Sequence, residues 1–404
     1  MSKCLICNHP VSRFISFGDM PIANGFLMEA EFANEKKYPL SVGLCEVCCM
    51  VQLTEVVGRE KMFHGDYPFF SSTSKFMQEH FRQMAEDALQ IVSDADPFVV
   101  EIGSNDGIML QNFALKGVRH LGVEPSANVA EMARGKGINT VCEFFDERLA
   151  RRIVADHGHA DLFLGANVMC HVQALPSVLA GVKILLKPKG LLIFEDPYLG
   201  DIIQKTSYDQ IYDEHVFYFS ALSIKKACAR FGLELIDALP QVVHGGSMRY
   251  IVGHAGAYPV SGSLEQQLAR EYGLHLDKSE AYVHFRSNVE HSRDNLMMVL
   301  EKFRRQGELV AGYAATSKST TVINYCCITK DHIAYICDTT PIKQGKFSPG
   351  AHIPIRPYEE FKAAPPPYAL LFAWNHSQEI FSKEQVYRNN GGKFILYVPN
   401  VHII

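Results

Sequence analysis

The 404-residue chain has no apolar run that approaches the length of a membrane-spanning helix, so we do not expect a membrane protein. Its start, MSKCLICNHP, lacks the apolar core of a secretory signal peptide. No basic run stands out and the formal net charge is −5, which argues against a nucleic-acid partner. Internal repeats and low-complexity tracts are absent, apart from PPP at 365–367. These absences favour a cytoplasmic globular protein, long enough for two or three domains.

The cysteines, by contrast, are spaced in a pattern typical of metal ligands. The chain has 11 cysteines, and without an export signal they indicate reduced thiols in a cytoplasm. Four of them form two C-x-x-C pairs: Cys4, Cys7, Cys45 and Cys48. Two such pairs are typical of a tetrahedral zinc site, and four thiolates leave no open position for water, so we expect a structural Zn²⁺. Cys49 breaks the spacing and is interpreted as a non-ligand. The alternative is four buried thiols without a metal.

A glycine-rich turn follows a hydrophobic stretch in FVVEIGSNDG, residues 98–107. This order predicts a buried parallel strand that ends in a tight loop, where nucleotide-type ligands bind in α/β sheets. Gly103 allows the backbone to approach a ligand closely, because it has no Cβ. About twenty residues later, Glu124 ends a second predicted strand, and a carboxylate at that place accepts both hydroxyls of a ribose.

The charge of this loop indicates which ligand it binds. A dinucleotide fingerprint takes a pyrophosphate, but here Glu101 and Asp106 make the loop acidic. An acidic loop suits S-adenosylmethionine (SAM), which carries a sulfonium and an ammonium and no phosphate. The pattern ExGSxxG with an acidic strand end resembles motifs I and II of class I methyltransferases; the alternative is an ordinary strand-to-helix turn. The predicted SAM-binding residues are Glu101, Gly103, Asn105, Gly107, Glu124 and Asn167.

Strand and helix patterns alternate along the chain, which implies a parallel sheet with helices on its faces. Strands are predicted at 98–102, 120–123, 160–164 and 190–195, and helices at 71–92, 127–135, 146–156 and, as one or two helices, 263–306. A second strand–loop pattern begins with LVAGYAATSKSTTVINYC at Leu309. We therefore predict an α/β protein with three parts: a zinc-binding domain (1–65), a SAM-binding Rossmann-like domain (66–257) and a second Rossmann-like domain (258–404).

The densest cluster of titratable groups is IYDEHVFYFS, which contains Tyr212, Glu214 and His215. An imidazole beside a carboxylate and a phenol offers a base, an orienting acid and a hydrogen-bond donor. Further side chains are predicted at the same sheet edge: Asn167 and His171 after one strand, and Tyr67 in DYPFFSSTS from the junction with the zinc-binding part. Each residue alone reads as an ordinary polar side chain, but their convergence on one edge indicates an active site.

The ordered set of motifs resembles the NDP-sugar C-methyltransferases, the TDP-4-keto-6-deoxyhexose 3-C-methyltransferases that make branched deoxysugars. The set covers essentially the whole chain: the two C-x-x-C pairs, DYPFFSSTS, EIGSNDG, NVxxHV, YDEH, HGGSMR and GYAATSKSTTVINYC. The resemblance implies a zinc-binding N-terminal domain, a central SAM domain and a C-terminal domain without cofactor. In that last domain, Ser317 and Lys318 suit the diphosphate of a nucleotide sugar, and Asp338 is expected to contact the nucleoside.

The resemblance also implies a mechanism. His215 removes the C3 proton of a 4-keto-6-deoxy nucleotide sugar, and the 4-keto oxygen becomes an enolate oxygen that hydrogen bonds stabilise. Glu214 is expected to orient or polarise His215, while Tyr212, Tyr67 and His171 contact the substrate and the enolate. Some members of the family methylate C5, and the sequence does not separate the two positions.

Two alternatives from other classes stay open. One is a class I methyltransferase that acts on oxygen or nitrogen, which gives no reason for the second Rossmann-like domain. The other is a zinc-ribbon binding protein with an inert methyltransferase-like part, which the intact acidic loop and Glu124 argue against. The expected partner is the small-molecule substrate, and for the oligomeric state we expect a monomer.

Overall fold

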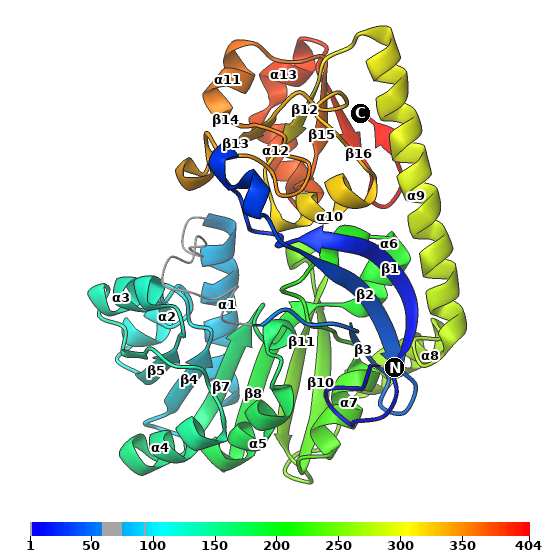
Figure 1. The fold of residues 1–404 in the computed structure, drawn as a ribbon. Helices are drawn as coiled ribbons and strands as arrows, with labels where there is room; N and C mark the ends of the chain where they lie inside the picture. The colour runs from blue at the N-terminus through cyan, green and yellow to red at the C-terminus, as the bar shows by residue number, and fades with distance from the viewer. Residues whose placement is uncertain (1, 59–74, 93) are drawn as a thin grey trace.

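The computed structural model describes residues 2–58, 75–92 and 94–404, and it is built around three β-sheets (Figure 1). No helix in the described part of the chain is long and apolar enough to span a membrane. The first sheet is antiparallel, in the order β1-β2-β3-β9. Its strands are β1 (Ser12–Pro21), β2 (Lys37–Cys45), β3 (Met50–Leu53) and, from far along the chain, β9 (Phe217–Tyr218).

The second sheet has seven strands in the order β10-β11-β8-β7-β4-β5-β6. Its strands are β4 (Phe98–Ile102), β5 (Arg119–Val123), β6 (Thr140–Val141), β7 (Ala160–Ala166), β8 (Leu186–Pro197), β10 (Leu233–Gln241) and β11 (Ser247–His254). β11 is antiparallel to both of its neighbours, whereas β4 to β8 run parallel. This order, with one antiparallel strand near its end, is that of the class I SAM-dependent methyltransferases, so the predicted fold class is confirmed.

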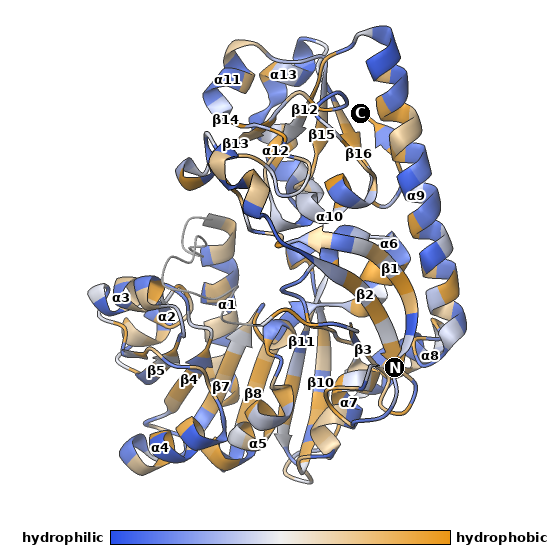
Figure 2. Cartoon of the chain, viewed as in Figure 1, coloured by the Kyte–Doolittle hydropathy of each residue, from blue (hydrophilic) through white to orange (hydrophobic). Residues whose placement is uncertain are grey.

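Helices cover both faces of the central sheet, which explains the continuous apolar runs of its parallel strands. Figure 2 shows hydrophobic residues along β7 and β8 and hydrophilic ones on the outer side of α4. The helices are α1 (Lys75–Ile91), α2 (Gln111–Ala114), α3 (Ala127–Gly135), α4 (Glu147–His157), α5 (Leu175–Leu185), α6 (Leu199–Lys205), α7 (Ala221–Ala229) and α8 (Gly262–Gly273). The Asp146 side chain begins α4 by accepting from the N–H of Leu149 at 2.7 Å, as an N-cap does.

A single long helix, α9 (Ser279–Gln306), runs beside the central and C-terminal parts (Figure 1). It ends at Gly307, whose φ of +71° is the left-handed conformation that glycine adopts at helix C-termini. The third sheet follows, in the order β14-β13-β12-β15-β16-β17. Its strands are β12 (Val310–Tyr313), β13 (Ile336–Asp338), β14 (Ile355–Pro357), β15 (Tyr368–Leu371), β16 (Lys393–Leu396) and β17 (His402–Ile403), with helices α10 (Ser317–Tyr325), α11 (Tyr358–Ala363), α12 (Ser377–Lys383) and α13 (Gln385–Asn389).

Candidate functional site

The loop after β4 forms the predicted cofactor side of the site. Gly103 has a φ of +62°, and its N–H donates to the carbonyl of Val123 at 2.8 Å. A Cβ on Gly103 would lie 2.6 Å from Cγ2 of Val168, and a Cβ on Gly107 (φ +81°) would lie 2.9 Å from Cγ1 of Ile138. Both positions therefore require glycine because of their positive φ and because neighbouring side chains leave no room for a Cβ. The sequence had suggested a different reason at Gly103, namely the close approach of a ligand.

Three buried carboxylates surround this loop: Glu101, Asp106 and Glu124. Glu124 accepts from the backbone N–H groups of Asn105 at 3.0 Å and Ser126 at 2.8 Å. Burial raises the pKa of Glu124. Burial, together with the charges of the other two carboxylates, raises the pKa of Glu101 well above its usual value. Glu101 Oε2 has no hydrogen-bond partner in the described part of the chain.

This acidic cluster fits a cationic ligand. Lys136 Nζ lies 3.1 Å from Asp106 Oδ2, and among the described residues no cationic side chain forms an ion pair with Glu101 or Glu124. A buried carboxylate without a countercharge is costly unless a ligand supplies the charge. The ammonium and sulfonium of SAM would do so, with Glu101 toward the charged end and Glu124 toward the ribose.

His215 follows the short 3₁₀ helix η5 (Tyr208–Gln210) and precedes β9. Its Nδ1 lies 2.8 Å from the carbonyl oxygen of Gln210, which only accepts, so Nδ1 carries the hydrogen. Its Nε2 lies 2.7 Å from the hydroxyl of Tyr212, which donates to it. Burial, with the nearby His171, lowers the pKa of His215 well below its usual value. His215 is therefore a neutral imidazole with a lone pair on Nε2, the form that a general base requires.

Glu214 lies in the cluster but does not orient His215, so that part of our expectation was wrong. Its Oε1 accepts from Nδ2 of Asn24 at 2.6 Å, and its Oε2 lies 4.0 Å from Nδ1 of His171. Burial raises the pKa of Glu214 to about 7. The backbone carbonyl of Gln210 takes the orienting role instead.

His171 reaches the cluster from the 3₁₀ helix η4 (Met169–His171), which follows β7. Its ring packs edge-on against that of His215, with 5.0 Å between centroids and 73° between planes. Burial lowers the pKa of His171 to about 4. The segments at 169–171 and 212–215 thus meet, as the strand order predicts, whereas Tyr67 lies outside the described residues.

Asn167, predicted as a cofactor residue, forms a hydrogen bond from its Nδ2 to Nε2 of His244 at 2.7 Å. Nε2 of Gln210 donates to the carbonyl of His244 at 2.7 Å. Burial lowers the pKa of His244 to about 3, so this ring too is neutral. His244 and Gln210 were absent from our predicted site. The HGGSMR motif pointed to His244, but Gln210 contributes through its backbone as well as its side chain and carries no motif.

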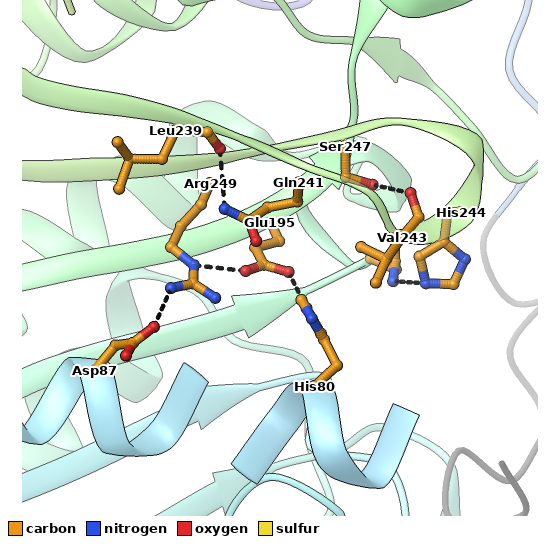
Figure 3. A network of polar contacts seen from close by, with 10 residues as sticks. His80, Asp87, Glu195, Leu239, Gln241, Val243, His244, Ser247 and Arg249 are labelled. Atoms are coloured by element: carbon orange, nitrogen blue, oxygen red, sulfur yellow. Dashed lines mark hydrogen bonds and ion pairs between the residues drawn. The ribbon is translucent and has the colours of Figure 1, made fainter. Parts of the chain in front are cut away.

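A buried ionic network lies beside this cluster and ties α1 to the sheet (Figure 3). Glu195, near the end of β8, accepts from His80 Nε2 at 2.6 Å and from Arg249 Nε at 2.5 Å. Nη1 of Arg249, on β11, also pairs with Asp87 at 2.9 Å, and both His80 and Asp87 belong to α1. Burial acts to raise the pKa of Glu195, but the hydrogen bonds and charges of His80 and Arg249 lower it overall.

On the C-terminal side, α10 points its first turn at the cluster. Ser317 Oγ donates to Oδ1 of Asn24 at 2.9 Å. The Nζ of Lys318 is buried, has no hydrogen-bond partner in the described part of the chain and lies 5.5 Å from the ring centroid of Trp374. Burial lowers the pKa of Lys318, and the charge of Asp209 opposes that shift. An unpaired buried ammonium is suited to an anionic ligand.

Asp338, predicted to contact a nucleoside, lies at the end of β13. Its Oδ2 accepts from the N–H of Ala315 at 2.7 Å, and its Oδ1 from the N–H of Thr340 at 2.7 Å. The carboxylate therefore braces the loop before α10, and its contact with a nucleoside stays a prediction.

The four predicted zinc ligands converge in the N-terminal part. Their Sγ atoms all lie within 4.8 Å of one another, with 3.5 Å between Cys4 and Cys48, 3.4 Å between Cys7 and Cys45 and 3.5 Å between Cys7 and Cys48. Tetrahedral Zn²⁺ with Zn–S bonds of about 2.3 Å needs S–S edges of about 3.8 Å. The thiols are therefore placed to hold zinc as a closed structural site, and Cys49, whose Sγ accepts from Lys226 at 3.0 Å, is outside the set.

Family models match three successive segments of the chain. A zinc binding domain matches residues 4–63, a methyltransferase domain matches 75–238 and a C-methyltransferase C-terminal domain matches 242–399. Across the whole length, the C-methyltransferase NovU from Streptomyces niveus is 32% identical over 408 residues, covering 100% of this chain and 97% of that protein.

Solved structures resemble the chain over less than half of its length. The magnesium protoporphyrin IX methyltransferase ChlM from Synechocystis PCC 6803, with bound SAM, is 12% identical and has a TM-score of 0.34; it covers 44% of this chain and 79% of that one. The CcbJ methyltransferase from Streptomyces caelestis is 13% identical with a TM-score of 0.34, covering 44% and 90%. Likeness at this level carries no argument about substrate.

Proposed function

The chain belongs to the C-methyltransferase family, and from this premise we propose that it methylates C3 of a 4-keto-6-deoxy nucleotide sugar. The observation that carries the proposal is the neutral, buried His215 with its lone pair on Nε2. Transfer of a methyl group to carbon needs a base for a C–H bond, and a ketone beside that bond makes it acidic. Membership of this family also disfavours the alternative of transfer to oxygen or nitrogen.

In the proposed reaction the C3 proton moves to Nε2 of His215, and the electron pair of the broken C–H bond forms the enolate. SAM, when bound, supplies the electrophilic methyl group. Tyr212 donates to Nε2 in the free protein, so its hydroxyl turns away before Nε2 accepts the C3 proton and is then available to the enolate oxygen. His171 and Glu214, within 4.0 Å of each other, are proposed to bind the sugar.

The nucleotide half of the substrate is proposed to lie on the C-terminal part. The unpaired ammonium of Lys318 and the hydroxyl of Ser317 suit a diphosphate. Asp338 is proposed to reach the nucleoside from the neighbouring strand. This assigns the SAM-binding role to residues 66–257 and the nucleotide-sugar role to residues 258–404, with residues 1–65 as the zinc-binding domain.

The test is deuterium uptake by a 4-keto sugar nucleotide in deuterium oxide, with S-adenosylhomocysteine in place of SAM. Deuterium should appear at C3, because deprotonation beside a ketone need not await methyl transfer. His215→Asn keeps a similar shape without a basic nitrogen and should reduce both exchange and methylation by about 10²–10⁴. Near-normal exchange in this variant would make Glu214 or His171 the better base, and deuterium at C5 would move the reaction to the other side of the ketone.

A further inference from the structure

The N-terminal part of the chain reaches into the catalytic cluster. Its β1 and β2 lie between the central sheet and the C-terminal part (Figure 1). Directly after β1, the segment Ile22–Phe26 turns tightly, with the N–H of Gly25 donating to the carbonyl of Ile22 at 3.0 Å. This turn presents Ala23 and Asn24 to the segment that carries His215.

The turn makes hydrogen bonds on its central side. The N–H of Ala23 donates to Oδ1 of Asp213 at 2.8 Å, and Nδ2 of Asn24 donates to Oε1 of Glu214 at 2.6 Å. Donation to a carboxylate favours its charged form. The hydrogen bond from Asn24 therefore lowers the pKa of Glu214, whereas burial and the charge of Asp213 both raise it.

The same two residues make hydrogen bonds on the C-terminal side. Ser317 Oγ donates to Oδ1 of Asn24 at 2.9 Å, and Thr320 Oγ1 donates to the carbonyl of Ala23 at 2.8 Å. The amide of Asn24 thus uses its nitrogen toward Glu214 and its oxygen toward Ser317. One side chain joins the proposed substrate loop to the catalytic cluster.

The N-terminal sheet also holds the other end of the catalytic segment. β9, which begins two residues after His215, pairs with β3, and the N–H of Leu53 donates to the carbonyl of Val216 at 2.9 Å. The segment is therefore held by N-terminal residues both at Asp213 and Glu214 and immediately beyond His215.

We propose that Asn24 is a positioning residue that holds Glu214 beside His171 and links it to Ser317 in the first turn of α10, where the nucleotide sugar is proposed to bind. The zinc-binding part of the chain is then a component of the active site. This inference rests on the proposed function for the identity of the ligand at α10, and on two hydrogen bonds for the link between Asn24, Ser317 and Glu214.

The test compares Asn24→Ala, Asn24→Asp and the control Asn34→Ala, which removes an exposed asparagine of the same part of the chain. Asn24→Asp keeps the shape and the acceptor for Ser317 but loses the donor to Glu214. Both Asn24 variants should lower kcat by about 10- to 100-fold, the range for a hydrogen bond to a charged group. SAM affinity and zinc content should match those of Asn34→Ala.

A pH profile separates positioning from simple structural damage. The titratable groups around Glu214 are Asp213 on its own segment and Cys170 and His171 on η4. Loss of the Asn24 donor should move the acid limb of kcat to higher pH, because the carboxylate form of Glu214 is then less favoured. Unchanged kcat, or a fall in kcat with an unmoved acid limb, would overturn the inference.

A sugar-free measurement keeps this result separate from the proposed function. Infrared titration of the Glu214 carboxyl, assigned with Glu214→Gln, should show a higher pKa in Asn24→Ala than in wild type. If the wild-type protein accepts no 4-keto sugar nucleotide, the proposed substrate is wrong, and this titration alone decides the role of Asn24. An unshifted Glu214 would contradict the inference whatever the substrate.

Discussion

The two Rossmann-like halves use the same backbone device to build a ligand loop. In each half a residue with positive φ follows the first strand: Gly103 at +62° and Ala314 at +71°. The N–H of each donates to the end of the second strand, at 2.8 Å and 2.9 Å. Each half also has a carboxylate at this place that accepts from two backbone N–H groups. It is Glu124, directly after β5, in the central half and Asp338, the last residue of β13, in the C-terminal half. The geometry of the loop is thus common to both halves.

The halves differ in the charge around that loop. The central half buries Glu101 and Asp106 with Glu124. The C-terminal half instead buries two ammonium groups, that of Lys318 near Asp209 and that of Lys343 near Asp338. A cationic ligand suits the first set and an anionic ligand the second. A few side chains therefore give the same backbone device opposite charge in the two halves.

The largest effect is expected from loss of one zinc ligand in the N-terminal part, which contacts both halves. Cys48→Ser leaves three thiolates, and because structural zinc binding is coupled to folding the N-terminal part should unfold. Methylation should be lost, since this part contacts the His215 segment on both sides. Metal analysis and circular dichroism would check this. Stoichiometric zinc with full activity in the variant would contradict it, and Cys49→Ser is the matched control.

The next largest effect is expected on SAM affinity, from substitutions at the equivalent positions Gly103 and Ala314 of the two loops. Gly103→Val adds a side chain at a positive φ and against Val168, so the loop must shift, and we expect SAM affinity to fall by about 100-fold as the site is displaced. Ala314→Val, at the equivalent place, should leave SAM affinity unchanged. Calorimetry with both variants decides, and a loss of SAM binding in Ala314→Val alone would reverse the assignment of the halves.

A smaller and more specific effect is expected from the charge of the second loop. Lys318→Ala should weaken binding of a nucleotide sugar by about 10- to 100-fold, as for a lost hydrogen bond to a charged group, with SAM affinity unchanged. Lys330, an exposed lysine of the same part of the chain, provides the control Lys330→Ala. The opposite pattern, with SAM affinity reduced and sugar affinity intact, would rule out the proposed division of ligands.

The smallest effect is expected on the pH dependence of the free energy of unfolding, through Glu101 in the protein without ligand. Because burial raises the pKa of Glu101, the folded state holds its proton more tightly than the unfolded state does. The free energy of unfolding should therefore fall as pH rises from about 4.5, the unfolded value, through the raised folded pKa, and level off above it. Glu101→Gln should flatten this fall in denaturant titrations, and SAM should reduce it in wild type.

Much of the fold follows from local patterns. The helix predicted at 127–135 is α3 and the strand predicted at 98–102 is β4, because apolar periodicity and capping residues act over a few positions. The C-x-x-C spacing likewise predicted the four cysteines whose Sγ atoms lie within 4.8 Å of one another. The predicted helical stretch 263–306 is two helices, α8 and α9, joined at 274–278.

Other features depended on contacts that no local pattern encodes. Glu214 was expected to serve its neighbour His215, yet its partner is Asn24, 190 residues away in the sequence. Asn24 also meets Ser317, 293 residues away. A side chain's nearest neighbour along the chain is a poor guide to its partner, because in a turn adjacent side chains point in different directions.

The sequence by itself determined four cysteines as candidate zinc ligands, the acidic loop after β4 and the titratable residues around His215, since each is a short motif whose chemistry depends on residue type and spacing. Only the tertiary structure decided which of these residues contact one another. In the tertiary structure the Gln210 carbonyl accepts from Nδ1 of His215 and orients its ring. The N-terminal turn lies between Glu214 and Ser317. Those choices come from the packing of three sheets against one another, and such packing sums many weak long-range contacts that no short stretch of residues specifies.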